Sequence, residues 1–359
     1  MSTAPLSHTF WAGRRVFVTG HTGFKGGWLM GVLQRLGATA TGYALAPPST
    51  PSLFEVADVS RFGGSTIGDI RDGARLNAAM AAASPDIVLH LAAQALVRPA
   101  RAEPVETFST NVVGTAQVLE AVRQAPSVQA CVVVTSDKVY DNVEWPWAYR
   151  ETDRLGGKEP YGASKACTEI VVESYRASYF SSDGHGALLA SARAGNVIGG
   201  GDWAEDRLIP DAIRAFTAGE KLMIRNPASV RPWQHVLEPL SGYLRLAEAL
   251  IQRGNSLPQP LAFNFGPAQA DAVPVRVIVD EITARWADGA SWGHDTRYQP
   301  YEARLLEVDS AKAHSALAWR PRWRLAQALD QTIAWYKAHA GGQDMNAFTL
   351  RQIDEYLNG

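Results

Sequence analysis

Short apolar runs alternate with segments of helical periodicity along the first half of the chain. The runs that predict β-strands lie at residues 16–18, 40–45, 65–69, 85–91 and 128–135. Helices are expected over residues 28–36 and 75–83, around residue 111, and over residues 161–180. The run at 85–91 is of the kind that is buried on both faces of a parallel sheet. The alternation therefore predicts an α/β fold with a doubly wound parallel sheet.

The pattern changes after residue 195, where glycines and prolines cluster and the helices shorten. Further strands are expected at 221–224 and 261–265, the second of which would return to the main sheet. Amphipathic helices are expected at 310–319 and 325–339. We expect residues 1–193, with a returning segment at 235–265, to form the sheet domain. Residues 194–234 and 266–359 would then form a smaller C-terminal lobe.

Composition and charge narrow the class of protein. The chain has 359 residues, of which 46 % are hydrophobic, and this suits an ordered globular protein. A formal net charge of −2 gives no basic excess that would favour nucleic acid, and no apolar run is long enough to span a bilayer. Cys131 and Cys167 lack the spacing of a disulfide framework or a metal site. We therefore expect a cytoplasmic protein without a bound metal.

A glycine-rich turn follows the first predicted strand. Its sequence, VFVTGHTGFKGG over residues 16–27, places Gly20, Gly23 and Gly26 between a strand and a helix. Glycines at this spacing permit a tight turn and a close approach of the backbone to a pyrophosphate, which would lie at the helix N-terminus. The turn therefore predicts a dinucleotide site. Lys25 within it could reach a phosphate, although a solvated lysine is the more common outcome.

The second predicted strand bears on the choice of cofactor. The end of the second strand, residues 43–46, carries no Asp or Glu, and the first arginine beyond it is Arg61. The usual side-chain partners of the NAD ribose and of the NADP phosphate are thus both missing there, and the choice between NAD and NADP stays open.

His90 lies within the fourth predicted strand, where a core histidine with satisfied hydrogen bonds is expected.

The carboxyl end of the fifth predicted strand carries reactive side chains. Ser136, Asp137 and Lys138 follow the strand, and Tyr161 and Lys165 lie four residues apart on the next helix, so that they share a face. A lysine beside a phenol lowers the pKa of the phenol because it favours the charged form. A tyrosine so placed can act as a general base toward a substrate hydroxyl. Together with the glycine turn, this pattern favours catalysis.

These motifs resemble those of the extended short-chain dehydrogenases/reductases, which carry TGxxGxxG (residues 19–26 here), a Ser or Thr at the end of a central strand (Ser136) and YxxxK (Tyr161 and Lys165). Within that family the chain is most similar to the nucleotide-sugar 4,6-dehydratases that act on CDP-glucose. The similarity rests on longer motifs over nearly the whole chain: GYALAPPSTPSLFE at 42–55, GDIRD at 68–72, HLAAQALVR at 90–98, TSDKVYDN at 135–142, RAGNVIGGGDWAEDRLIPD at 193–211 and RPWQHVLEPLSGY at 231–243.

The resemblance implies a Rossmann-type sheet, a C-terminal substrate-binding lobe, NAD as cofactor and a homodimer formed through helices near 107–124 and 161–180. It also implies two sets of binding residues. The cofactor would be bound by Gly20, Thr22, Gly23, Phe24, Lys25, Gly26, Asp69, Ile70, Leu91, Ala92, Ala93, Gln94, Asn111 and Thr135, with Tyr161 and Lys165. The sugar nucleotide would be bound by Asn196, Arg207, Leu208, Arg225, Arg231, His235 and Glu302.

The implied reaction is the dehydration of CDP-glucose to CDP-4-dehydro-6-deoxyglucose, a step of deoxysugar biosynthesis. Tyr161 would take the C4 hydroxyl proton and Asp137 would protonate the departing C6 hydroxyl. Other nucleotide-sugar dehydratases have Glu where this chain has Lys138, so the base that removes the C5 proton stays open, with Lys138 as the candidate. Two alternatives remain. A nucleotide-sugar 4-epimerase would share Tyr161 and Lys165, and a non-catalytic dinucleotide-sensing protein could dispense with both.

Overall fold

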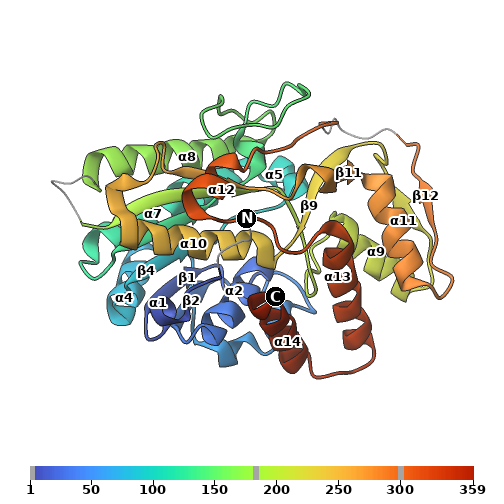
Figure 1. Ribbon diagram of the computed structural model, residues 1–359, viewed down its shortest axis with the longest axis horizontal. Helices are drawn as coiled ribbons and strands as arrows, with labels where there is room; N and C mark the ends of the chain where they lie inside the picture. The colour runs from blue at the N-terminus through green and yellow to red at the C-terminus, as the bar shows by residue number, and fades with distance from the viewer. Residues whose placement is uncertain (1–4, 181–185, 298–302) are drawn as a thin grey trace.

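The computed structural model describes residues 5–180, 186–297 and 303–359, and a seven-stranded parallel sheet lies at its centre (Figure 1). The strand order is β10-β6-β5-β4-β1-β2-β3, and every neighbouring pair is parallel. The predicted doubly wound sheet is confirmed, and the predicted strand at 261–265 does return to it as β10. The strands are β1 (Arg15–Thr19), β2 (Thr39–Ala44), β3 (Gly64–Ile67), β4 (Ile87–His90), β5 (Ala130–Val134), β6 (Leu188–Ala194) and β10 (Ala262–Phe265).

Helices cover both faces of this sheet because alternate strand residues point to opposite sides. Val16 and Val18 pack in one core with α2 (Phe24–Arg35) and α10 (Leu237–Arg253). Phe17 packs in the other core. That second core lies under α4 (Gly73–Ala83), α7 (Gly114–Gln124) and α8 (Pro160–Tyr179). The strand ends that carry the candidate site therefore open at one edge of a sheet that is packed on both faces.

Two smaller sheets accompany the main one. One has the order β11-β9-β7 and the other pairs β12 with β8. Helices α9 and α11 lie with β12 at one end of the molecule, with α13 beside them (Figure 1). The predicted strand at 221–224 is confirmed as β8. The bounds are β7 (Asn196–Ile198), β8 (Leu222–Ile224), β9 (Val230–His235), β11 (Ala272–Pro274), β12 (Trp292–His294), α9 (Leu208–Thr217), α11 (Val275–Trp286) and α13 (Leu325–Ala340).

The predicted C-terminal helices are confirmed as α12 (Ala311–Leu317) and α13, and a further helix, α14 (Met345–Asn358), packs on α2. Short helices complete the described part of the chain. They are α1 (His8–Trp11), α3 (Leu53–Val56), α5 (Val97–Ala102) and α6 (Pro104–Phe108), with a π-turn at Ser109–Val113 and 3₁₀ turns at Val59–Phe62, Asp137–Val139, Gly254–Ser256 and Gln269–Asp271.

Local chemistry fixes two helix ends that matter for the site. Gly37 has φ +76°, and the Ala38 N–H bonds to the Leu33 carbonyl, so α2 stops where a glycine permits the left-handed turn. At the start of α8, the Glu159 side chain accepts hydrogen bonds from the N–H groups of Tyr161 and Gly162, and Pro160 occupies the first helical position. Tyr161 is thereby held at the N-terminus of its helix.

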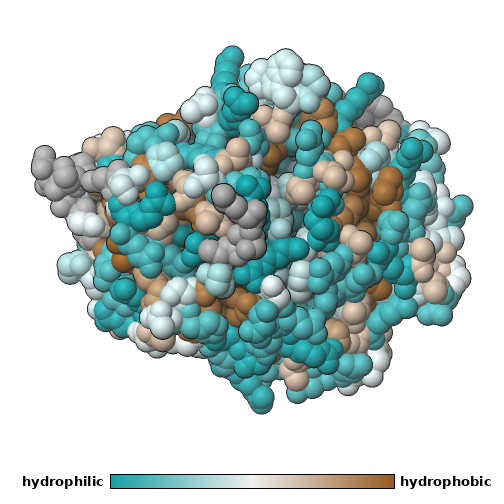
Figure 2. All heavy atoms as spheres, in the orientation of Figure 1, coloured by the Kyte–Doolittle hydropathy of each residue, from teal (hydrophilic) through white to brown (hydrophobic). Residues whose placement is uncertain are grey.

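Hydrophilic side chains predominate on the face shown in Figure 2, and hydrophobic ones form scattered groups between them. No helix within the described ranges is both long and apolar enough to cross a bilayer.

Candidate active site

The glycine turn forms a close-packed cradle between β1 and α2. Gly20 has φ +81°, and a Cβ there would lie 2.7 Å from the Ala92 amide nitrogen. A Cβ on Gly26 would lie 2.0 Å from the Gly20 carbonyl oxygen, so only glycine permits this contact. Gly23 caps α2 without a side-chain hydrogen bond, which leaves the first N–H groups of the helix to an anion. This geometry fits the pyrophosphate of a dinucleotide.

The ends of β2 and β3 are joined by hydrogen bonds beside this cradle. The Thr22 hydroxyl donates to the Leu45 carbonyl, and the Tyr43 hydroxyl donates to the Asp69 carbonyl. Arg71 binds the Asp69 carboxylate through Nε and Nη2 and holds the pKa of that carboxyl below its ordinary value. Asp69, which the resemblance assigned to the cofactor, is thus held rigidly by a neighbouring cation.

The predicted core role of His90 is confirmed. Its ring nitrogens lie 2.7 Å from Thr19 Oγ1 and 3.0 Å from Thr115 Oγ1, and its side chain is fully enclosed. Burial lowers the pKa of His90 to about 3, so the ring is neutral. Thr19 Oγ1 also accepts the N–H groups of Leu91 and Ala92, which fixes the exit of β4 next to the glycine turn.

Asn111 lies in the π-turn before α7 and joins two parts of the site. Its Oδ1 accepts the Gln94 N–H, while its Nδ2 donates to the Gln94 carbonyl and to Ser164 Oγ. The side chain therefore links the loop after β4 to α8. The resemblance assigned Asn111 to the cofactor, but both ends of its amide are occupied by protein groups.

The reactive side chains meet at the end of β5. Ser136 Oγ donates to Asp137 Oδ1 at 3.0 Å and also forms a hydrogen bond with Tyr161. Asp137 is buried, and burial raises the pKa of its carboxyl despite the nearby Lys138. Its Oδ2 has no hydrogen-bond partner among the described residues. A Cβ on Gly195 would lie 2.8 Å from that oxygen, so the chain leaves room for it only as glycine.

The expected lowering of the Tyr161 pKa by Lys165 is not what the structure shows. Burial raises the pKa of Tyr161, and the groups that oppose this rise are Ser136, through its hydrogen bond, and Arg207, through its charge. Lys165 donates instead to the Val134 carbonyl at 3.3 Å, and burial lowers the pKa of its ammonium to about 8. The enclosed site disfavours both charged forms, which the sequence pattern alone could not indicate.

Lys25 is a second correction. A solvated side chain was expected, but Lys25 is half-buried and burial lowers its pKa to about 7. The cations Arg207 and Lys165 lower that pKa further, and the carboxylates of Asp137 and Asp202 oppose them. Lys25 thus faces the reactive cluster from the start of α2.

Arginines expected to bind the sugar nucleotide gather on the other side of this cluster. Arg207 caps the N-terminus of α9 and its Nη1 lies 3.0 Å from Asp202 Oδ2. Arg225 Nη1 lies 3.6 Å from Asp206 Oδ1, which also binds Arg98, on α5, at 2.9 Å. Leu208 begins α9 beside them.

Arg231, on β9, donates to the carbonyls of Val230 and Ala303 and lowers the pKa of Asp137 through its charge. Asn196 begins β7 and pairs with Trp233 in the small sheet. Glu302, the last of the expected substrate residues, lies outside the described residues.

His235 is a third correction. The resemblance placed it at the substrate, but its side chain is completely buried, with ring centroids 5.7 Å from Trp28 and 4.9 Å from Trp323. Burial lowers its pKa to about 3. The structure places it in the core beneath the site, where its ring packs between two indoles.

A turn of three glycines, residues 199–201, packs between α2 and α13. A Cβ on Gly200 would lie 2.0 Å from the Trp335 ring, and the Gly200 carbonyl accepts the indole N–H of Trp28 on α2. A Cβ on Gly199 would lie 3.2 Å from Phe24 at the start of the same helix. Asp202 follows directly and was missed by sequence reasoning, although it stands within the motif GGGDW.

The family is decided by the comparison with known proteins. The family model described as "NAD dependent epimerase/dehydratase family" matches residues 16–264, more than half of the chain. The chain belongs to this family. A relative from Salmonella typhimurium (strain LT2), named CDP-glucose 4,6-dehydratase, is 49 % identical over 356 residues, which cover 98 % of this chain and 99 % of the relative.

Solved structures show the same fold. A UDP-glucose 4-epimerase from Thermotoga maritima, solved with UDP-glucose, has a TM-score of 0.77 and 22 % identity and covers 90 % of this chain and 99 % of its own. A dTDP-glucose 4,6-dehydratase from Bacillus anthracis, solved in complex with NAD, has a TM-score of 0.74 and 20 % identity and covers 91 % and 98 %. Rossmann-type architecture, as the sequence predicted, is therefore confirmed.

Proposed function

We propose that this protein is a hydro-lyase that converts CDP-glucose to CDP-4-dehydro-6-deoxyglucose with NAD as cofactor. The 49 % identical relative that bears the name CDP-glucose 4,6-dehydratase supports this activity, and the family description supports NAD. The observation that carries the proposal is the buried Asp137 carboxyl beside Tyr161, with one oxygen that no described residue binds. A dehydration needs such an acid for the departing hydroxyl, whereas a 4-epimerisation does not.

Proton transfers among the chain's own residues follow from this geometry. Tyr161 takes the proton of the sugar C4 hydroxyl, assisted by its hydrogen bond with Ser136. The resulting 4-ketone acidifies the C5 proton, which Lys138 removes. Asp137, whose carboxyl pKa burial raises, gives its proton to the C6 hydroxyl, which leaves as water. Lys138 returns its proton to C5 once C6 has received the hydride. Tyr161 has gained the proton that Asp137 lost, and exchange with solvent restores both groups, so the net change is the loss of one water.

Bound NAD supplies the acceptor for the C4 hydride and its return to C6. The cradle formed by Gly20, Gly23 and Gly26 would hold its pyrophosphate at the start of α2. Lys165, on the same face of α8 as Tyr161, would hold the cofactor at the reactive end of the site.

The sugar nucleotide would bind on the opposite side. Arg207, Arg225 and Arg231 offer guanidinium groups that match phosphate oxygens, and Lys25 would add a cation between the two ligands. The binding roles of Asn196, Leu208 and Glu302 remain part of this proposal.

The proposed function is tested by incubating the purified protein with CDP-glucose, dTDP-glucose and UDP-glucose separately and following the products by mass spectrometry. Loss of one water from CDP-glucose alone is expected. A product of unchanged mass that is the galactose isomer would show an epimerase instead. No conversion in the presence of added NAD would overturn the enzymatic assignment.

We also propose a homodimer through α7 and α8 with the adjoining α6. Exposed apolar side chains along this face support it: Val105 and Phe108 on α6, Val113 in the π-helix before α7, and Ile170 and Tyr179 on α8. Light scattering after size exclusion would test this, and a dimeric wild type with a monomeric Ile170→Asp variant is expected. The proposed compartment is the cytoplasm, which suits the two free cysteines.

A further inference from the structure

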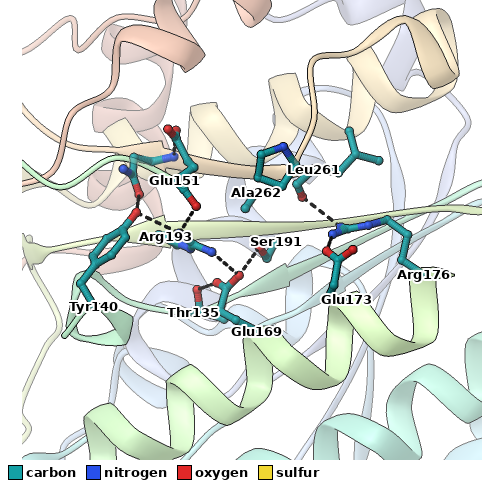
Figure 3. A network of polar contacts seen from close by, with 12 residues as sticks. Thr135, Tyr140, Glu151, Glu169, Glu173, Arg176, Ser191, Arg193, Leu261 and Ala262 are labelled. Atoms are coloured by element: carbon teal, nitrogen blue, oxygen red, sulfur yellow. Dashed lines mark hydrogen bonds and ion pairs between the residues drawn. The ribbon is translucent and has the colours of Figure 1, made fainter. Parts of the chain in front are cut away.

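A buried ion pair lies behind the reactive cluster, outside the residues that the proposed reaction uses. Arg193 Nη2 on β6 lies 2.8 Å from Glu169 Oε2 on α8, and the two side chains are 3 % and 4 % exposed (Figure 3). Burial alone would raise the pKa of Glu169, but Arg193 and hydrogen bonds from Thr135 and Ser191 outweigh it and hold the pKa below its ordinary value. Glu169 is therefore an enclosed carboxylate with a permanent negative charge.

The ion pair holds both ends of the turn that carries Ser136, Asp137 and Lys138. On the near side, Thr135 Oγ1 donates to Glu169 Oε1 at 2.5 Å. On the far side, Arg193 Nη1 donates to the Tyr140 hydroxyl oxygen at 2.9 Å, and that hydroxyl donates to Asn264 Oδ1 on β10. Figure 3 shows Tyr140 at the Arg193 end of the pair and Thr135 at the Glu169 end. A shift of Glu169 or Arg193 would move the turn between these two anchors.

Glu169 also acts on the site lysine. It lies four residues after Lys165 on the same face of α8, and its charge raises the pKa of Lys165, which burial lowers to about 8. The other groups that face Lys165 do not supply this charge. Lys25, from α2, is a cation that interacts with Lys165, and His90, from β4, is neutral. Tyr161 lies one turn earlier on α8 and carries no charge in its phenol form.

We propose that Glu169 is a positioning residue for the reaction: with Arg193 it fixes the Ser136–Asp137–Lys138 turn, and it places a buried carboxylate one helical turn from Lys165. The inference deepens the proposed function and rests on it for the catalytic consequence alone. Stability as such does not explain a buried ion pair, because well-packed apolar residues often replace such pairs without loss. What an apolar pair could not supply is the negative charge next to Lys165 or the acceptor for Thr135.

The direct test uses the ligand-free protein, so it does not depend on the proposed reaction. Lysine side chains labelled with ¹³C at Cε are titrated by NMR, and the Lys165 signal is assigned by its loss in Lys165→Arg. In Glu169→Gln the pKa of Lys165 should fall from about 8 by about one pH unit or more. Glu173→Gln is the matched control, since it makes the same change one turn further along α8, where Glu173 is exposed and pairs with Arg176. An unchanged Lys165 titration in folded Glu169→Gln would overturn the inference.

Glu169→Gln leaves Arg193 buried without its partner and can fail to fold. If Glu169→Gln does not fold, Thr135→Val tests the positioning role, because it removes one hydrogen-bond donor to Glu169 and keeps the ion pair with Arg193. We expect kcat for dehydration of CDP-glucose to fall about tenfold while KM changes less than twofold, since the turn is mispositioned but the substrate arginines are untouched. Thr332→Val is its control: this buried hydroxyl donates to a carbonyl of its own helix, α13. Equal losses in both variants would mean that Thr135 is merely structural.

If the wild-type protein does not dehydrate CDP-glucose, the proposed function is wrong. The Lys165 titration, which needs no substrate, then tests the role of Glu169 by itself.

Discussion

Arg207 Nη1 lies 3.0 Å from Asp202 Oδ2, and this contact fixes a candidate phosphate ligand to the glycine turn that packs on α2. Asp202 is itself held, because its Oδ1 accepts the Ala204 N–H and its carbonyl accepts the Tyr336 hydroxyl. The guanidinium is therefore oriented before a substrate arrives, which reduces the entropy that binding must remove.

We expect Asp202→Asn to raise KM for CDP-glucose about tenfold with little change in kcat, because Arg207 loses its charged anchor while the shape of the turn is kept. Steady-state kinetics measure this. Asp211→Asn is the control, since it removes the carboxylate that pairs with Arg214 on the outer part of α9. Equal effects of the two variants on KM would refute a special role for Asp202.

Gly26→Ala should disrupt the cofactor cradle. The added Cβ would lie 2.0 Å from the Gly20 carbonyl oxygen, which is backbone and cannot rotate away, so α2 must separate from β1. Overpacking of this kind costs about 1–3 kcal/mol of unfolding free energy. Urea unfolding measures the loss, and calorimetric titration with NAD should show binding weakened below detection. In Gly23→Ala the nearest atom would lie 3.4 Å away, an ordinary contact, so its unfolding free energy should stay close to that of the wild type. Unimpaired NAD binding by Gly26→Ala would contradict the cradle.

The correction at His235 leads to a prediction about acid stability. Burial lowers its pKa from 6.5 to about 3, so the unfolded chain binds a proton there that the folded protein does not. This contribution to stability is therefore present above pH 6.5 and is lost as the pH falls toward 3. Between about pH 7.5 and pH 5 the single residue should account for a loss of about 2 kcal/mol. His235→Phe, which keeps an aromatic ring between the two indoles, should remove that part of the loss. Parallel pH profiles of wild type and variant in urea unfolding would show that the histidine is not the cause.

The sheet and the glycine turn could be predicted from sequence because each depends on neighbouring residues. An apolar run such as 85–91 is typical of a buried strand, and Gly26 is required by its contact with Gly20 within one strand-turn-helix unit. The same holds for the end of α2 at Gly37 and for the core role of His90 within its strand.

The details that sequence could not predict depend on contacts between distant segments. Lys25 lies near charged groups from distant parts of the chain, among them Arg207 and Asp137, and nothing near residue 25 indicates that. Thr135 and Glu169 come together only when α8 crosses β5, so the anchor of the reactive turn is invisible in the motif TSDK. The raised pKa of Tyr161 likewise comes from burial by the whole fold, which outweighs the lysine four residues away.

Asp137→Asn separates the two halves of the proposed chemistry. Burial raises the pKa of the Asp137 carboxyl, and only a protonated group can release the C6 hydroxyl as water, whereas the C4 oxidation depends on Tyr161. We expect the variant to show absorbance of reduced nicotinamide on mixing with CDP-glucose and NAD, with dehydrated product reduced at least about a hundredfold. Stopped-flow absorbance and mass spectrometry measure the two signals. Normal product formation would remove Asp137 as the acid.

Lys138→Ala tests the remaining step, the removal of the C5 proton. Exchange of that proton with deuterium from solvent should slow by about 10²–10⁴-fold, the usual contribution of a general base. Lys158→Ala, at an exposed position before α8, is the control and should exchange at the wild-type rate. Lys138 is half-buried beside Asp137, and its positive charge lowers the pKa of the Asp137 carboxyl. Lys138→Ala therefore removes a cation from the neighbourhood of the acid as well as the candidate base. Lys138→Met and Lys138→Arg separate the two effects. If only the positive charge at residue 138 matters, Lys138→Arg should retain product formation and C5 exchange. If Lys138 is the base, both Lys138→Arg and Lys138→Met should lose them.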